Sequence, residues 1–130
     1  MYTDLFGEAR TGTYGRLDDA RVVMEMAEAS GLPLVSQEKR DPRVTTSYGT
    51  GEMIRDALDR GFTDISIAIG GSATNDGGMG CMSALGVRFL DENGDVLRGC
   101  GADLLRVRDR PVWHGSEGKE LQIYGNVRCD

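Results

Sequence analysis

The chain has 130 residues, a net charge of −6, and 39% hydrophobic against 28% charged residues, which is typical of a single globular domain over residues 1–130. The acidic balance and the lack of a lysine or arginine cluster disfavour binding to nucleic acid or to an anionic membrane surface. No apolar run approaches the roughly 18 residues that a membrane-spanning helix needs, so we expect no membrane partner.

The first half of the chain shows helical spacing of apolar residues in two places. The predicted elements are short turn-rich pieces over residues 1–16, a helix over 18–30, a short strand over 32–35 and a helix over 51–60. Asp18 or Asp19 can cap the first helix, and Gly31 and Gly61 follow the two helices as C-terminal stops.

The second half places a strand, a glycine-rich loop and a helix in direct succession. Residues 64–69 form an apolar run with little polar content, which is typical of a strand buried on both faces. The loop over 70–80 leads into a helix predicted over 78–86. The side chains of that helix expected to face the core are Met79, Met82 and Leu85. A helix, a buried strand, a loop and a helix in this order predict an α/β fold, a sheet with flanking helices.

Two further elements are predicted before the chain ends. Residues 87–97 have the pattern of a hairpin around Asn93-Gly94, a pair that suits the positive φ of a tight turn. The same segment superficially resembles a calcium loop, but Ala102 stands where the twelfth position needs Glu, which disfavours calcium. Residues 120–130 offer a last strand that stops abruptly, so we expect the chain to be a piece of a longer protein.

The cysteines are odd in number and lack Cys-x-x-Cys spacing; they are Cys81, Cys100 and Cys129. This pattern disfavours a disulfide framework or a zinc site and favours a reducing cytoplasm. Cys81 falls within a predicted helix, where we expect a buried and unreactive thiol.

The glycine-rich stretch "IAIGGSATNDGGMG" is the strongest candidate for a binding site. In open α/β sheets, ligands bind beyond the carboxyl ends of the strands, where the following helix exposes unpaired N–H groups. The candidate ligand-binding residues are Gly70, Gly71, Ser72, Thr74, Asn75, Gly77 and Gly78, with Asp76 as the carboxylate. The alternative is a turn that only packs the helix on the strand, but several polar groups in one loop need partners, which favours a site.

Familiar catalytic loops do not fit this stretch. A Walker A loop needs a lysine, which is missing here, and the dinucleotide fingerprint Gly-x-Gly-x-x-Gly is absent in this register. A nucleophile elbow at Ser72 would need glycine where Thr74 stands, and a serine hydrolase needs a histidine, for which the chain offers His114 alone.

The segment "IGGSATNDGGMGCMSALG" closely resembles the glycine loop of the bacterial glycerate kinase family, which phosphorylates D-glycerate with ATP. The segments "EMAEASGLPLV", "TTSYGTGEMIRDALDRG" and "LGVRFLDENGDVL" resemble the same family in the same order. The likeness covers roughly residues 7–105, and the final "VRCD" is similar to a later family segment, whereas residues 106–120 match poorly. The family's Asp-Ser-Phe-Lys-Gly segment is missing. The resemblance implies that the chain is one domain of a two-domain kinase.

The resemblance also implies roles for individual residues. Asp76 would be the general base toward the substrate hydroxyl or a Mg²⁺ ligand, although a cap of the following helix explains it as well. Asp130 stands where the family places an aspartate after cysteine and would contact metal or substrate; its alternative is a frayed terminus. Thr46 and Thr50 in "TTSYGTGE" would form a second anion site, or merely cap a helix.

The function expected from the resemblance is transfer of the terminal phosphate of ATP to glycerate, with Mg²⁺ as the metal. The alternative is a non-catalytic anion-binding or assembly module that has kept the loop and lost the chemistry. The sequence leaves open which hydroxyl is phosphorylated, where adenine binds, whether the protein forms a homodimer, and whether this chain is active by itself.

Overall fold

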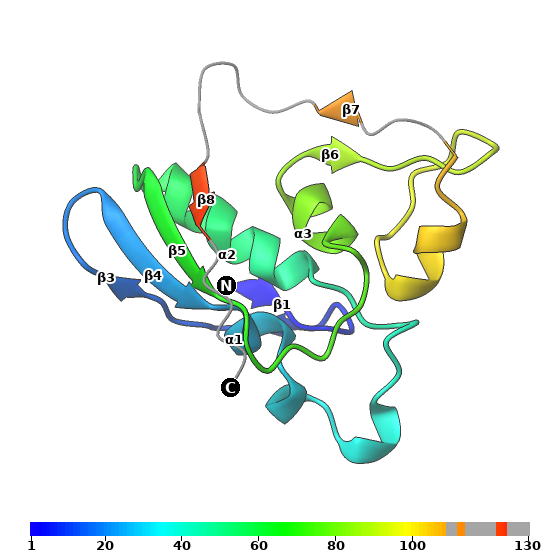
Figure 1. Ribbon diagram of the computed structural model, residues 1–130, viewed down its shortest axis with the longest axis horizontal. Helices are drawn as coiled ribbons and strands as arrows, with labels where there is room; N and C mark the ends of the chain where they lie inside the picture. The colour runs from blue at the N-terminus through cyan, green and yellow to red at the C-terminus, as the bar shows by residue number, and fades with distance from the viewer. Residues whose placement is uncertain (109–111, 114–121, 125–130) are drawn as a thin grey trace.

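The computed structural model describes residues 1–108, 112–113 and 122–124. Their central feature is a sheet with the strand order β3-β4-β5-β8 (Figure 1). Its strands are β3 (Gly15–Arg16), β4 (Arg21–Glu25), β5 (Asp64–Ala68) and β8 (Gln122–Tyr124). β3 and β4 are antiparallel, whereas β5 runs parallel to both β4 and β8. The parallel strands and the helices between them confirm the α/β class.

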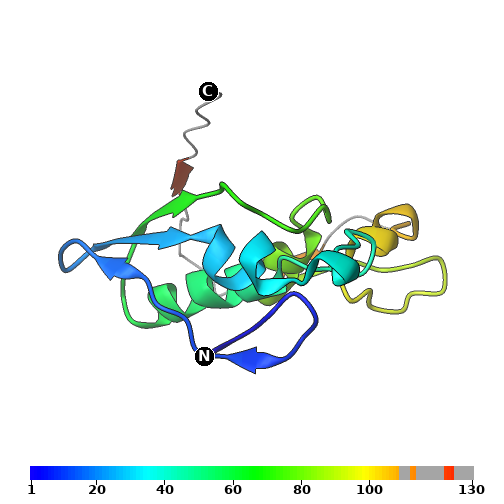
Figure 2. The same cartoon turned by 90° about the horizontal axis from the view of Figure 1, so that it is seen from below.

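Helix α2 (Tyr48–Asp59) covers one face of this sheet. Figure 2 shows the sheet and α2 as two layers, with the blue N-terminal hairpin of β1 (Tyr2–Thr3) and β2 (Ala9–Arg10) on the far side of α2. The core between the layers consists of Val22, Met24, Ile65, Met53, Ile54 and Ala57 together with Tyr2 and Ala29. Burying one of the larger of these side chains stabilises the fold by about 1.5–3 kcal/mol.

The helix predicted over residues 18–30 is wrong for its first half. Strand β4 occupies Arg21–Glu25, and only Met26–Ser30 form a helix, α1. In β4 every second side chain is buried, an alternation that brings Val22 and Met24 to the core. The pairing with β3 and β5 on its two edges favours the extended state, and residues distant in sequence supply that pairing.

The strand predicted over residues 32–35 is also wrong. Leu32–Leu34 form a short 3₁₀ helix, η1. Pro33 explains the difference, because proline has no N–H to donate to a strand ladder and its fixed φ suits the first turn of a helix.

Two predictions around the centre of the chain are confirmed with changes. The helix predicted over 51–60 is α2, which begins at Tyr48 rather than at residue 51. The strand predicted over 64–69 is β5, but it is not buried on both faces: Ile65 is buried and Ile67 half-buried on one face, whereas Ser66 and Ala68 on the other face are exposed.

Helix α3 (Met79–Ala84) confirms the helix predicted over 78–86 and packs against α2 (Figure 1). Met79 faces the core as expected, but Met82 is 40% exposed, so the prediction that it points inward is wrong. The side of α3 that is buried carries the small residues Gly80 and Ala84 beside Met79, and the spacing of the large apolar residues does not reveal that side.

The hairpin predicted over 87–97 forms only in part. A tight turn surrounds Gly94, which has φ +80°, and Leu90 and Val96 form an isolated antiparallel bridge. The regular strand β6 (Val87–Arg88) instead pairs with β7 (Val112–Trp113). The remaining short helices are η2 (Gln37–Lys39) and η3 (Gly101–Leu105). None of the helices in the described ranges is long and apolar enough to cross a membrane.

Candidate functional site

The glycine-rich loop 70–80 lies between the carboxyl end of β5 and helix α3, as the sequence predicts. Its first half is held against the end of α1: Leu32 N donates to Gly71 O at 2.9 Å, and Ala73 N donates to Ser30 O at 2.8 Å. Thr45 Oγ1 donates to Ala73 O at 2.9 Å from a third segment. The loop therefore has a defined position although it is rich in glycine.

The loop contains three exposed glycines whose N–H groups are candidates for binding a ligand. Gly70, Gly71 and Gly77 are exposed, and among the described residues their N–H groups donate to no protein acceptor. Gly71 and Gly77 have φ values of +71° and +64°, a conformation that favours glycine. Gly70 has neither a positive φ nor a neighbour within 4 Å of an added Cβ, so the fold itself does not require glycine there. The missing side chain of Gly70 would instead allow a ligand to approach the backbone closely.

The hydroxyl groups of the loop form a pair beside these N–H groups. Ser72 Oγ and Thr74 Oγ1 are 2.8 Å apart, and Thr74 N donates to Ser72 Oγ at 3.1 Å. Both side chains are half-buried, and Asn75 next to them is exposed. The arrangement can offer hydroxyl and amide groups to the oxygens of a small polar ligand.

Asp76 differs from the rest of the loop because it is buried, with 2% of its surface exposed. Its Oδ2 accepts hydrogen bonds from Ser47 N at 2.7 Å, Ser47 Oγ at 2.8 Å and Gly80 N at 3.2 Å. Its Oδ1 accepts a hydrogen bond from Gly78 N at 2.9 Å, and the N–H group of Gly78 therefore points to the carboxylate. The N-cap position of α3 is Gly78, so Asp76 is not itself the N-cap residue, but its carboxylate accepts N–H groups from the first turn of the helix.

The described residues do not fit a magnesium site at Asp76. Magnesium prefers carboxylate oxygens in octahedral geometry and keeps several of its waters. Both oxygens of Asp76 already accept protein donors, and the side chain is closed to solvent. No group of three or more His, Cys, Asp or Glu side chains that could hold a metal ion occurs in the described ranges. A metal-binding or general-base role for Asp76 stays a prediction of the sequence.

The segment "TTSYGTGE" is not the loop that the sequence suggests. Gly49, Thr50 and Gly51 lie inside α2 and are buried. An added Cβ would lie 2.0 Å from Thr3 O at Gly49 and 2.3 Å from Cys81 O at Gly51. These glycines let β1 and α3 approach α2, so close packing rather than anion binding requires them.

The hydroxyl groups of the two threonines proposed for binding contact protein atoms. Thr50 Oγ1 and Ser30 Oγ are 2.8 Å apart in the interior. Thr46 Oγ1 donates to Gly99 O at 2.8 Å and accepts from Tyr48 N at 3.2 Å. Both threonines are buried, and their roles as ligand-binding residues stay predictions. Asp130, Cys129 and His114 lie outside the described residues.

The thiol of Cys81 has the character that the sequence predicts. Burial, and secondarily the negative charge of Asp76, raise its pKa to about 11. A thiol with this pKa is almost wholly protonated at neutral pH and is a poor nucleophile. Cys81 is half-buried rather than fully buried as expected, and it packs against the hydrophobic core.

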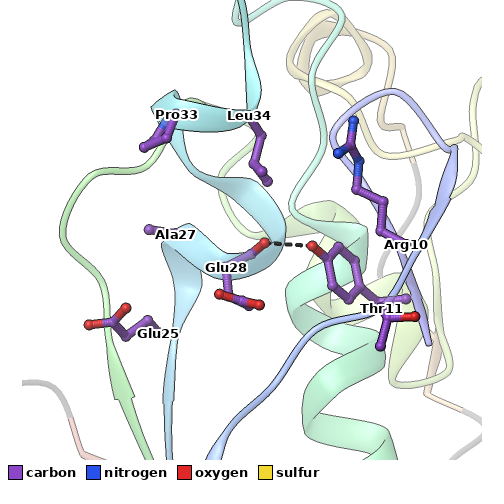
Figure 3. A pocket seen from close by; sticks show the side chains of 8 residues that line it. Arg10, Thr11, Glu25, Ala27, Glu28, Pro33 and Leu34 are labelled. Carbon is purple, nitrogen blue, oxygen red and sulfur yellow. Dashed lines mark hydrogen bonds between the residues drawn. The ribbon is translucent and has the colours of Figure 1, made fainter.

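A cleft of about 540 Å³ lies at the carboxyl end of β4, next to the start of the loop (Figure 3). Glu25, Glu28 and Arg10 line it together with apolar side chains. Tyr2 donates its hydroxyl hydrogen to Glu28 O at 2.7 Å, the bond drawn in the figure. Ala27 connects the cleft to the loop, because its Cβ is 3.7 Å from an added Cβ at Gly71.

Sequence reasoning missed these cleft residues, and it missed Ser47. The cleft forms from β2, β4, α1 and η1, so no contiguous motif marks it. A signal for Ser47 was present, since serine is a favoured residue directly before a helix, but the predicted helix began at residue 51. A second cleft of about 520 Å³ is lined by Tyr14, Asp56 and Phe62 among others, near the start of β5.

Comparison with known proteins gives one consistent result. The chain matches the sequence model of the glycerate kinase family over residues 1–123. It is 50% identical over 129 residues to the glycerate 2-kinase of Escherichia coli strain K12, covering 98% of this chain and 34% of that protein. It is 45% identical over 125 residues to the glycerate kinase of Halalkalibacterium halodurans, covering 95% of this chain and 33% of that protein.

A solved structure agrees with the sequence comparison. The crystal structure assigned as glycerate kinase 2 from Salmonella typhimurium LT2 has a TM-score of 0.78 and 45% identity, over 82% of this chain and 29% of that chain. The chain thus spans about a third of the length of the curated relatives it matches. The match over residues 1–123, with the glycine loop in its middle, shows that the chain belongs to the glycerate kinase family.

Proposed function

We propose that this chain is the part of a glycerate kinase that holds the acid substrate or the transferred phosphate. The observation that carries the proposal is the set of three exposed glycine N–H groups, at Gly70, Gly71 and Gly77, next to the hydroxyl pair of Ser72 and Thr74. Such N–H groups bind anionic oxygens at the end of a parallel strand. Glycerate and the phosphates of ATP are the anions that the family implies.

The reaction needs positioning and charge stabilisation more than covalent help from the protein. An oxygen of glycerate attacks the γ-phosphorus of ATP, the bond from that phosphorus to the β-phosphate oxygen breaks, and the hydroxyl proton leaves to a base. The loop N–H groups hold anionic oxygens, and Ser72, Thr74 and Asn75 orient the hydroxyls of glycerate. Mg²⁺, when bound, would neutralise charge on the phosphates; Asp130, which the resemblance implies as a metal or substrate contact, is its remaining candidate residue.

The hydroxyl at carbon 2 is the proposed acceptor. The support is the name of the Escherichia coli relative, a glycerate 2-kinase that is 50% identical to this chain. The product would be 2-phosphoglycerate and ADP, and the reaction would take place in the cytoplasm. The remaining two thirds of a typical relative's length would supply the groups that this chain lacks, so the isolated chain would turn over glycerate slowly or not at all.

A second function, a non-catalytic anion-binding or assembly module, is favoured by one observation. The carboxylate of the loop, Asp76, accepts four donors of the protein itself and offers no open oxygen to a substrate proton. A module that binds without reacting needs the N–H groups but no base.

The test is phosphorus NMR of a complete polypeptide that carries these residues, with ATP and D-glycerate. The expected product is 2-phosphoglycerate, and the double variant Ser72→Ala, Thr74→Val should raise the KM for glycerate about tenfold or more, as expected when two hydroxyls that bind the uncharged hydroxyls of glycerate are removed together. Ser30→Ala is the control, because it removes a serine hydroxyl that lies on α1 and is bonded to Thr50 rather than to the loop. A complete enzyme that binds glycerate and forms no phosphoglycerate would favour the module instead.

A further inference from the structure

The buried carboxylate of Asp76 connects two helix N-termini rather than facing the ligand side of its loop. Ser47, the residue before α2, donates both its N–H and its hydroxyl hydrogen to Asp76. Gly78 and Gly80, at the start of α3, donate their N–H groups to the same carboxylate. Ser47 Oγ in turn accepts from Cys81 N at 3.0 Å, which closes the network.

The segments around the network are closely packed. An added Cβ at Gly80 would lie 2.1 Å from Thr46 Oγ1 and 2.8 Å from Asp76 Oδ2. One at Gly99 would lie 3.0 Å from the Cα of Gly80. The start of α3 is therefore enclosed by the segment before α2 and by the segment before η3.

The turn at Gly77 and Gly78 depends on this network. Both glycines have positive φ, and Gly78 N–H is bonded to Asp76 Oδ1. Gly77, which lies between Asp76 and Gly78, is exposed, and its N–H donates to no acceptor among the described residues. Releasing the carboxylate for a reaction would leave buried donors of Ser47 and Gly80 without acceptors, which carries a large desolvation penalty.

We propose that Asp76 is a positioning residue that acts through Ser47: the pair fixes the Gly77–Gly78 turn, and Asp76 does not take the proton of the substrate. The inference rests on the proposed function only in that loop 70–80 is the ligand site. Ser47 is buried and far from the loop in the sequence. The inference nevertheless gives it an indirect role in ligand binding.

The test is a double-mutant cycle of Ser47→Ala and Asp76→Asn in the full 130-residue chain, with Ser30→Ala as control. The first readout is hydrogen exchange of the amides of residues 77–81. The second is the Kd for D-glycerate and, separately, for inorganic phosphate. Each single variant should speed exchange and weaken binding about tenfold, and the double variant should be no worse than the single ones, since residues of one network are not additive. Ser30→Ala should stay within about twofold of the unchanged chain.

Two results would overturn the inference: Ser47→Ala exchanging and binding as the unchanged chain does, or additive effects of the two substitutions. Should Asp76→Asn fail to fold, Ser47→Ala against Ser30→Ala decides alone, because each removes one buried hydroxyl. If the unchanged chain binds neither probe, the proposed function of the loop fails, whereas the exchange readout still decides whether Asp76 and Ser47 act together.

Discussion

Replacing Gly51 by alanine should destabilise the protein although alanine is the better helix former. In the interior of a helix, glycine to alanine contributes about 1 kcal/mol of stability by propensity alone. At Gly51, however, the new methyl group would lie 2.3 Å from Cys81 O and 2.7 Å from the Cβ of Ala84. The first of these is a backbone atom of α3, which can move only if α2 and α3 separate.

The size of the effect follows from these two opposing terms. Overpacking of a well-packed interior costs about 1–3 kcal/mol and sometimes more, and a contact with backbone belongs to the upper part of that range. After the gain in helix propensity, we expect a net loss of about 1–2 kcal/mol. For a chain of this length the melting temperature should fall by about 4–8 °C.

The assay is thermal unfolding followed by circular dichroism, with Gly70→Ala as the matched control. Gly70 has no positive φ and no neighbour within 4 Å of an added Cβ, so alanine there should be neutral or slightly stabilising. A Gly51→Ala variant that melts at or above the temperature of the unchanged chain would show that the close packing of α2 on α3 is not what requires glycine at this position.

Three further outcomes are expected. Burial alone would raise the pKa of Asp4, but the hydrogen bond from Arg10 and those from two backbone N–H groups outweigh it and lower the pKa below 3.8. Ionised Asp4 therefore stabilises the fold at pH values above the usual pKa of an aspartate, and this contribution is lost as the pH falls through the lowered pKa. The variant Asp4→Asn should accordingly flatten the dependence of melting temperature on pH below about 4. Iodoacetamide should alkylate Cys81 much more slowly in the folded chain than in urea at pH 8, as measured by mass spectrometry, because its pKa is about 11; equal rates would contradict this. Met82→Lys should change the free energy of unfolding in urea by less than about 0.5 kcal/mol, because the side chain is exposed; a loss of 2 kcal/mol would place Met82 in the core after all.

The glycine loop could be predicted because its signal is local. An apolar run followed by glycines and small polar residues specifies a strand, a turn and a helix start within one stretch of chain, and the structure has β5, the loop and α3 in that order. The exposed N–H groups of Gly70, Gly71 and Gly77 follow from the same stretch. The bonds between Asp76 and Ser47 could not be predicted, because the two residues are far apart in the sequence.

Two of the errors share one physical cause. Residues 18–30 have a spacing that suits a helix, yet 21–25 form a strand because β3 and β5 offer hydrogen bonds on both of its edges. The glycines of "TTSYGTGE" look like a loop, yet they lie in α2 because β1 and α3 pack directly on them. In each case a contact with a distant segment outweighed a weak local preference.

The sequence by itself determined the α/β class, the position of the glycine loop and the family to which the chain belongs, since these depend on contiguous motifs and on the order of elements. Only the tertiary structure decided which residues hold the loop in shape. A carboxylate that the sequence suggests as a base is enclosed by donors from the starts of two helices, and glycines in a segment suggested as an anion site instead allow packed backbones to approach closely. The physical reason is that hydrogen bonding and close packing depend on distances in space, which the spacing of residues along the chain does not set.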